Sequence, residues 1–127
     1  MALRPKFSII TITYNAASVI GPTLQSVLSQ TYTNYEYLLI DGGSKDDTVE
    51  KAKASGIEFA HIVSERDKGI YDAMNKGIAL ATGDYLCFLN AGDAFYSPDT
   101  LQKIVDTVAG ESELPHVLYG ETAEVNE

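Results

Sequence analysis

Polar and acidic residues follow three apolar, strand-like segments of this chain, at the point where each segment ends. The three clusters are Tyr14-Asn15 after residues 8–13, Asp41 after residues 37–40, and Asn90-Ala91-Gly92-Asp93 after residues 85–89. In an open parallel sheet, ligands bind in the crevice beyond the carboxyl ends of the strands. The pattern therefore predicts one composite site built from all three clusters.

The last cluster suits a divalent cation, because small residues around Asp93 let a hard oxygen ligand approach without crowding. Such a cation commonly also binds phosphate. The chain has 18 acidic and 9 basic residues and a formal net charge of -9. A nucleotide diphosphate would therefore need local positive charge, which a bound metal supplies. The same imbalance argues against nucleic acid as a partner, since no face rich in Lys and Arg is visible.

Strand-like and helix-like segments alternate along the chain, which is typical of βαβ units and a mainly parallel sheet. We expect strands at residues 8–13, 37–40, 57–63, 85–89 and 116–119, and helices at about 20–30, 44–54, 70–82 and 98–108. The length of 127 residues suits one domain, residues 1–127. The fold class predicted from this alternation is α/β.

Two of the helices carry more specific expectations. Ser44 is expected to cap the second helix by accepting a hydrogen bond from the backbone N–H of Asp47. On the third helix, large apolar residues recur at a spacing that predicts one buried face. These residues are Ile70, Met74, Ile78 and Ala81, and the polar residues expected to point elsewhere are Asp72, Asn75 and Lys76.

Other features restrict the compartment and the chemistry. No apolar stretch approaches the roughly 18 to 20 residues that span a bilayer, and the first residues lack the apolar core of a signal peptide. We therefore expect a cytoplasmic protein. The single cysteine, Cys87, lies in an apolar strand and is interpreted as a buried structural thiol. His61 and His116 lack paired ligands nearby and are interpreted as structural.

Five sequence blocks in order carry a family resemblance. They are residues 8–15 (SIITITYN), 29–32 (SQTY), 39–48 (LIDGGSKDDT), 64–77 (SERDKGIYDAMNKG) and 81–93 (ATGDYLCFLNAGD). Together they resemble family 2 of the inverting nucleotide-sugar glycosyltransferases, most closely bacterial members that build capsular or exopolysaccharides. The resemblance runs from about Phe7 to Tyr119. It implies the GT-A fold, a three-layer αβα sandwich around a mostly parallel, Rossmann-like sheet.

The resemblance also implies roles for the three clusters. Tyr14 and Asn15 would belong to the nucleotide pocket, with the Tyr14 ring stacked on the base. Asp41 would help to hold the nucleoside; the next position is often acidic in the family but is Gly42 here. The Asn90–Asp93 loop matches the metal motif, in which Asp93 would coordinate Mn²⁺ or Mg²⁺ on the donor diphosphate. Gly92 stands where many relatives have a second Asp.

The implied reaction is a direct displacement at the anomeric carbon of a nucleotide diphosphate sugar, with UDP-sugars the expected donors. Lys68, before a helix N-terminus, could assist the leaving diphosphate, and Asp72 and Asn75 could meet the donor sugar or ribose. The acceptor would be a glycan or a lipid-linked hydroxyl in polysaccharide biosynthesis, at the inner face of the membrane or in peripheral contact with it. The general base is expected beyond Glu127, so residues 1–127 would form the donor-binding part, truncated before the acceptor-binding half.

Plainer interpretations stand beside each role. Tyr14 could fill a strand end, Asp41 could cap a turn, and Asp93 could assist the following helix. Lys68, Asp72 and Asn75 could be ordinary solvated residues. At the level of function, the alternatives are a non-catalytic module that binds nucleotide sugars and a flavodoxin-like phosphoacceptor domain.

Overall fold

The strands form one parallel sheet. The computed structural model describes residues 4–108 and 117–118, and in these residues the strand order is β3-β2-β1-β4-β5 with every neighbouring pair parallel. The strands are β1 (Phe7–Thr13), β2 (Tyr35–Asp41), β3 (His61–Ser64), β4 (Tyr85–Phe88) and β5 (Val117–Leu118). The remainder of the expected last strand, His116 and Tyr119, lies outside the described residues.

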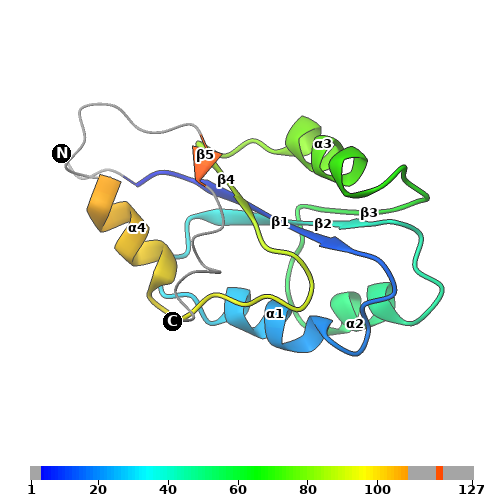
Figure 1. Ribbon diagram of the computed structural model, residues 1–127. Coiled ribbons are helices and arrows are strands. Elements are labelled where there is room, and N and C mark those ends of the chain that lie inside the picture. The colour runs from blue at the N-terminus through cyan, green and yellow to red at the C-terminus, as the bar shows by residue number, and fades with distance from the viewer. Residues whose placement is uncertain (1–3, 109–116, 119–127) are drawn as a thin grey trace.

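Helices cover both faces of this sheet (Figure 1). The helices α1 (Ile20–Leu28), α2 (Thr48–Ala54) and α4 (Thr100–Val108) lie on one face, and α3 (Ile70–Leu80) lies on the other. The predicted three-layer αβα architecture is therefore confirmed.

Successive residues of the central strands pack into two cores, one on each face. Phe7, Ile9 and Leu39 belong to the larger core, whereas Ile10 and Leu38 belong to the core under α3. Strands that are buried on both faces are mostly apolar. This explains Ile9-Ile10 in β1 and residues 38–40 in β2, whereas the buried hydroxyls of Ser8, Thr11 and Thr13 are hydrogen-bonded. Cys87 is buried in β4, as predicted.

The third strand is shorter than its sequence suggested, since pairing begins at His61 opposite Leu38 and not at Ile57. Ile57 and Phe59 instead pack against the larger core, and the rings of Phe59 and Tyr37 lie 5.0 Å apart. Ile57 and Phe59 thus pack against the core although they lie before the paired part of the strand. His61 itself is exposed.

The buried face of α3 also differs from the prediction. Ala73 and Gly77 face the sheet, while Ile70 and Ile78 are 48% and 44% exposed. A Cβ atom on residue 77 would lie 2.8 Å from Cγ2 of Ile10. The helix α3 therefore packs against the sheet through small residues. The face predicted to be buried instead carries the largely exposed Ile70 and Ile78.

Glu36 ties the strands together at the edge opposite the candidate site. Its carboxylate accepts hydrogen bonds from Ser8 Oγ (2.6 Å) and from the backbone N–H of Thr82 (2.7 Å), and lies 3.6 Å from Lys6 Nζ. Burial alone would raise the pKa of Glu36, but the hydrogen bonds from Ser8 and Thr82 outweigh it and lower this pKa. The charged carboxylate thus connects β1, β2 and the turn before β4.

Candidate functional site

The main cleft lies at the carboxyl edge of the sheet, between β1 and β4. The chain places β2 and β3 on one side of β1 and β4 and β5 on the other. Ligands of open α/β sheets bind where the strand order reverses in this way. A cleft of about 330 Å³ occupies this position, and its lining residues are Ile12, Thr13, Tyr14, Asp67, Gly69, Ile70 and Asn90. The structure thus brings Tyr14 and Asn90, predicted from separate clusters, to one cleft.

Tyr14 and Asn15 differ in how free their side chains are. The Tyr14 side chain is 58% exposed, so an aromatic face is available at the rim of the cleft. Asn15 has a φ of 49°, a left-handed conformation that Asn tolerates better than most residues. Its Oδ1 accepts from the N–H of Lys45 (2.8 Å), and its own N–H donates to Ser44 Oγ (2.7 Å). Asn15 therefore connects the loop after β1 to the loop after β2.

Asp41 lies beneath these loops and is fully buried. Oδ1 accepts from the hydroxyls of Thr13 (2.6 Å) and Ser44 (2.5 Å). Oδ2 accepts from the N–H of Gly43 (3.1 Å), the N–H of Ser44 (2.8 Å) and the hydroxyl of Ser64 (2.8 Å). Burial raises the pKa of Asp41, but these bonds outweigh it and lower this pKa. In this geometry the carboxylate organises the loop after β2.

The predicted capping role of Ser44 is wrong. The helix α2 begins at Thr48, and the N-cap residue Asp47 makes no side-chain capping hydrogen bond. The Ser44 hydroxyl lies too early for that helix and bonds to Asp41 and Asn15 instead. Ser44 thus connects the loop after β1 to the loop after β2 and does not cap α2.

We expect the stability of the fold to fall in acid. Because the pKa values of Asp41 and Glu36 are lowered on folding, the unfolded chain binds their protons more readily. Their contribution is complete above the ordinary carboxylate pKa of about 4 and is lost as pH falls through the folded values. Urea unfolding from about pH 7 to about pH 3 measures this slope. Asp41→Asn and Glu36→Gln should each flatten it, and an unchanged slope in both variants would contradict this explanation.

Asp67 is a site residue that the sequence interpretation missed. Its Oδ1 accepts from the N–H of Gly69 (3.1 Å), and its carboxylate lines the cleft. A Cβ atom on residue 42 would lie 2.9 Å from Asp67 Oδ2. The Asp67 carboxylate therefore fills the space beside Gly42 that a side chain at position 42 would need. In the sequence, only its place in the charged turn before α3 could have indicated this role.

The remaining residues of that turn are arranged around α3. Lys68 is exposed at the N-terminal end of the helix, and its backbone N–H donates to Asp72 Oδ2 (2.9 Å). Asp72 also lies 3.9 Å from Lys76 Nζ, which pairs with Glu65 at 3.0 Å. Asn75 is exposed on α3, away from the lining of the cleft. The structure thus gives Asp72 a bond at the start of its own helix and brings neither Asp72 nor Asn75 into the cleft.

The loop after β4 presents Asp93. The Asp93 N–H donates to the carbonyl of Asn90 (2.9 Å), which closes a tight turn, and the Asp93 side chain is exposed. Gly92 has a φ of 97°, in the region that favours glycine. This conformation gives a physical reason for glycine at this position.

This loop fits a cation that binds together with a phosphate ligand. Within residues 4–108, no group of three or more His, Cys, Asp or Glu side chains is placed to hold a metal. Mg²⁺ typically keeps several waters and uses one or two protein carboxylates together with substrate phosphates. Asp93 does not line the cleft, but it is exposed in the loop that begins at the lining residue Asn90, so it would supply one such carboxylate. The donor set does not form a preassembled metal cage.

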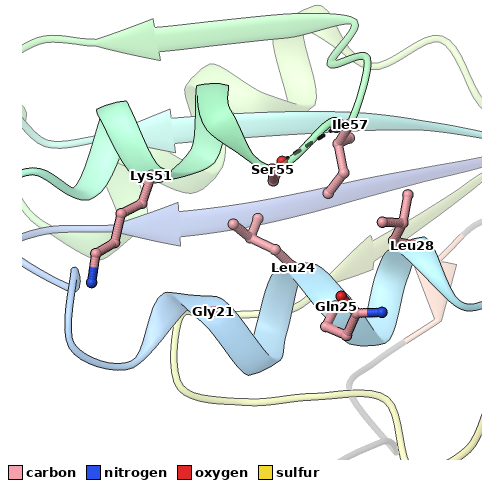
Figure 2. Close-up of a pocket in the computed structure, with 7 residues that line it drawn as sticks. All are labelled: Gly21, Leu24, Gln25, Leu28, Lys51, Ser55 and Ile57. Carbon is pink, nitrogen blue, oxygen red and sulfur yellow. Dashed lines mark hydrogen bonds between the residues drawn. The ribbon is translucent and has the colours of Figure 1, made fainter.

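A second hollow of about 230 Å³ lies between α1 and α2 (Figure 2). Leu24, Leu28 and Ile57 supply its apolar walls, and the Lys51 ammonium donates to the carbonyl of Ala17 (2.9 Å). Its lining contains no carboxylate, so the cleft between β1 and β4 is the stronger candidate.

None of the helices in the described residues has the length and apolar character needed to span a membrane.

Comparisons with known proteins show what this chain is similar to. The curated PGL/p-HBAD biosynthesis glycosyltransferase of Mycobacterium bovis is 42% identical over 124 residues, which cover 92% of this chain and 46% of that protein. The amylovoran biosynthesis glycosyltransferase AmsB of Erwinia amylovora is 32% identical over 91% of this chain and 40% of its own length. The chain thus spans less than half the length of these relatives.

A solved structure and a family match complete the comparison. The mannosyltransferase PcManGT from Pyrobaculum calidifontis, in complex with GDP-Man and Mn²⁺, superimposes with a TM-score of 0.76 at 27% identity, covering 87% of this chain and 34% of that one. The family described as glycosyl transferase family 2 matches residues 8–115. Both the predicted family and the GT-A fold are confirmed, and the chain belongs to glycosyl transferase family 2.

Proposed function

We propose that this chain binds the donor in a metal-dependent, inverting glycosyltransferase that uses a nucleotide diphosphate sugar. One observation carries the proposal: the cleft at the reversal of strand order has exposed Tyr14 at its rim, Asn90 in its lining and the exposed Asp93 just beyond. This arrangement offers an aromatic surface for a base beside an oxygen ligand for a cation on the diphosphate.

The nucleoside would occupy the side of the cleft formed by β1. The Tyr14 ring can stack on the base, and the Asp67 carboxylate can accept hydrogen bonds from the ribose or the base. Asp41 and Asn15 would act mainly by holding the loops on which these groups depend, because their oxygens already accept hydrogen bonds from those loops. Asp41 could contact the nucleoside directly only if one of its five donors moved.

The diphosphate would lie toward Asp93. When bound there, Mn²⁺ or Mg²⁺ would act as a Lewis acid that stabilises the charge on the departing diphosphate. Asp93 would hold the cation, and Lys68 would add positive charge near the N-terminal end of α3. The GDP-Man and Mn²⁺ bound by PcManGT support this choice of ligands. Asn75 and Asp72 could approach the donor sugar only after a movement of the α3 segment.

The names of two relatives support a choice of acceptor. These names refer to PGL/p-HBAD and amylovoran biosynthesis, which supports a glycan or a lipid-linked hydroxyl as acceptor in cell-surface polysaccharide synthesis. The transfer would then take place at the cytoplasmic face of the membrane. A general base would remove the proton of the attacking hydroxyl while the anomeric carbon inverts.

Titration calorimetry of the 127-residue chain with UDP and with GDP, each with and without Mn²⁺, tests this proposal. We expect one of the two nucleotides to bind, and more tightly with Mn²⁺. Tyr14→Ala should weaken binding by about tenfold in either condition, because stacking of a base on an aromatic ring contributes about 1–3 kcal/mol. Tyr14→Phe is the control and should bind like the wild type. The absence of binding by both nucleotides in both conditions would contradict donor binding by this chain.

A non-catalytic module that binds nucleotide sugars would give the same titration result. A transfer assay on a chain of the relatives' full length separates the two, since only an enzyme releases nucleoside diphosphate when the acceptor is added. Membership of glycosyl transferase family 2 excludes the phosphoacceptor domain considered from the sequence.

A further inference from the structure

Two polar residues of α1 and one just after the helix face the chain segment that carries Asp93. They are Thr23, Ser26 and Gln30, which lie three and four residues apart in the sequence. Thr23 is fully buried and Gln30 is 6% exposed. Buried polar side chains cost stability unless they are hydrogen-bonded, so their partners show what they do.

Thr23 holds the loop after β4 directly. Its hydroxyl donates to the backbone carbonyl of Asp93 (2.5 Å) and accepts from the backbone N–H of Gly92 (3.0 Å). One side chain thus holds the N–H of Gly92 and the carbonyl of Asp93, which belong to the peptide groups before and after the one that joins these two residues. Between these two contacts lies the left-handed Gly92, the residue with the greatest conformational freedom in the loop.

Ser26 and Gln30 continue the same contact along the chain. The Ser26 hydroxyl accepts from the N–H of Phe95 (3.1 Å), and Gln30 donates to the carbonyl of Ser97 (2.7 Å) and accepts from the N–H of Leu101 (3.0 Å). The segment from Gly92 to the start of α4 is therefore held against α1 by side chains of that helix.

The other end of α1 is fixed to the nucleoside side of the cleft. Just before the helix, the N–H of Ala16 donates to Thr48 Oγ1 (2.9 Å) and the N–H of Ala17 donates to Asp46 Oδ2 (3.1 Å). The first turn of α1 therefore lies between the loop that carries Tyr14 and the loop that carries Asp93, and hydrogen bonds join this part of the chain to both the loop after β2 and the loop after β4.

We infer that Thr23 is a positioning residue for the proposed metal site, through which α1 sets the place of Asp93 relative to Tyr14. This inference rests on the proposed function. Without the Thr23 hydroxyl, the bond from the Asp93 N–H to the Asn90 carbonyl would remain, but the Gly92 N–H and the Asp93 carbonyl would lose their partner. Asp93 would then have to be ordered further when the cation and diphosphate bind. Interactions behind a metal ligand commonly change metal affinity by about 10- to 100-fold.

The test compares Thr23→Val with Thr23→Ser in the 127-residue chain. Valine keeps the shape of threonine but removes the hydroxyl, whereas serine keeps the hydroxyl. Thr107→Val is the matched control, because Thr107 lies exposed on α4 and its hydroxyl bonds only within that helix, to the carbonyl of Lys103. Amide hydrogen exchange of Gly92 is measured without ligand, and UDP and GDP titrations are run with and without Mn²⁺.

In Thr23→Val, exchange at Gly92 should be about five- to tenfold faster, as expected for the loss of one hydrogen bond. The gain in nucleotide affinity from Mn²⁺ should fall by about tenfold, while affinity without metal should change less than about twofold. Thr23→Ser and Thr107→Val should match the wild type in both measurements.

Two results would overturn the inference. One is wild-type exchange at Gly92 in Thr23→Val; the other is an equal loss of affinity with and without Mn²⁺, which would indicate a general structural defect. If the wild-type chain binds neither nucleotide, the proposed function fails, and exchange at Gly92 still decides whether Thr23 positions the loop.

Discussion

Asp41→Ala should be strongly destabilising, with a loss of about 3 kcal/mol or more in the free energy of unfolding. The substitution removes the acceptor of five hydrogen bonds at a fully buried position. The donors left behind include the hydroxyl of Thr13, which is itself buried, and they cannot all reach water. Such unsatisfied donors cost about 1–3 kcal/mol each, less where water can enter. Urea unfolding monitored by circular dichroism measures the change.

Two variants show whether the carboxylate itself is responsible. Asp41→Asn keeps the shape but turns an N–H₂ group toward donors, so it should also be destabilising. Asp106→Ala removes an exposed carboxylate of α4 that accepts one hydrogen bond, from Gln102, and should stay within about 0.5 kcal/mol of the wild type. If Asp41→Ala were no less stable than Asp106→Ala, Asp41 would not organise the loops, and direct contact with the nucleoside would become its better explanation.

Asp93→Ala should abolish the effect of Mn²⁺ on nucleotide affinity while leaving the fold intact. The Asp93 side chain is exposed, so its removal should cost little stability. If Mn²⁺ tightens binding by about tenfold or more, at least about 1.4 kcal/mol depends on the cation, and the variant should lose all of it. Titration with and without Mn²⁺ gives this difference directly.

Charge must be controlled in that comparison, because the chain has a formal net charge of -9 and the loss of any carboxylate favours an anionic ligand. Asp106→Ala changes the net charge equally on the far part of α4 and should keep the full effect of Mn²⁺. An unchanged Mn²⁺ effect in Asp93→Ala would show that the cation binds elsewhere on the chain.

The sequence allowed much of the architecture to be predicted, because the central strands obey a simple rule. A strand buried on both faces is mostly apolar, and the residues that follow it are polar where the carboxyl edge of the sheet meets solvent. This is why Tyr14 and Asn90 could be predicted to lie together. On α4, Leu101, Val105 and Val108 are buried, at the spacing of one helix face.

Close packing of a helix on the sheet at a glycine explains why the buried face of α3 was predicted wrongly. Gly77 lets α3 pack on its small residues, and a periodicity that counts large apolar residues cannot register the absence of a side chain. The same limit concealed Asp67, whose place depends on the empty space beside Gly42. A sequence shows where the glycines are, but it does not show which helix, strand or loop packs against each of them.

Hydrogen bonds between distant segments explain why the roles of several polar residues were not predicted. Thr23 and Gln30 were interpreted only as members of a helix because their partners lie about 70 residues later in the chain. The sequence predicts a local helix cap for Ser44, whereas its hydroxyl is hydrogen-bonded to the backbone N–H of Asn15 and the carboxylate of Asp41. Local rules predict local hydrogen bonds, and this site depends on bonds between distant segments.

Paramagnetic broadening by Mn²⁺ in the nuclear magnetic resonance spectrum, recorded with the bound nucleotide present, tests the central claim most directly. Broadening falls off steeply with distance, so the affected amides locate the cation. We predict that Asn90, Gly92 and Asp93 lose intensity first, and that Asp93→Ala abolishes the effect. Broadening centred instead on the acidic turn at Glu65 and Asp67, and retained in Asp93→Ala, would contradict the proposed metal site.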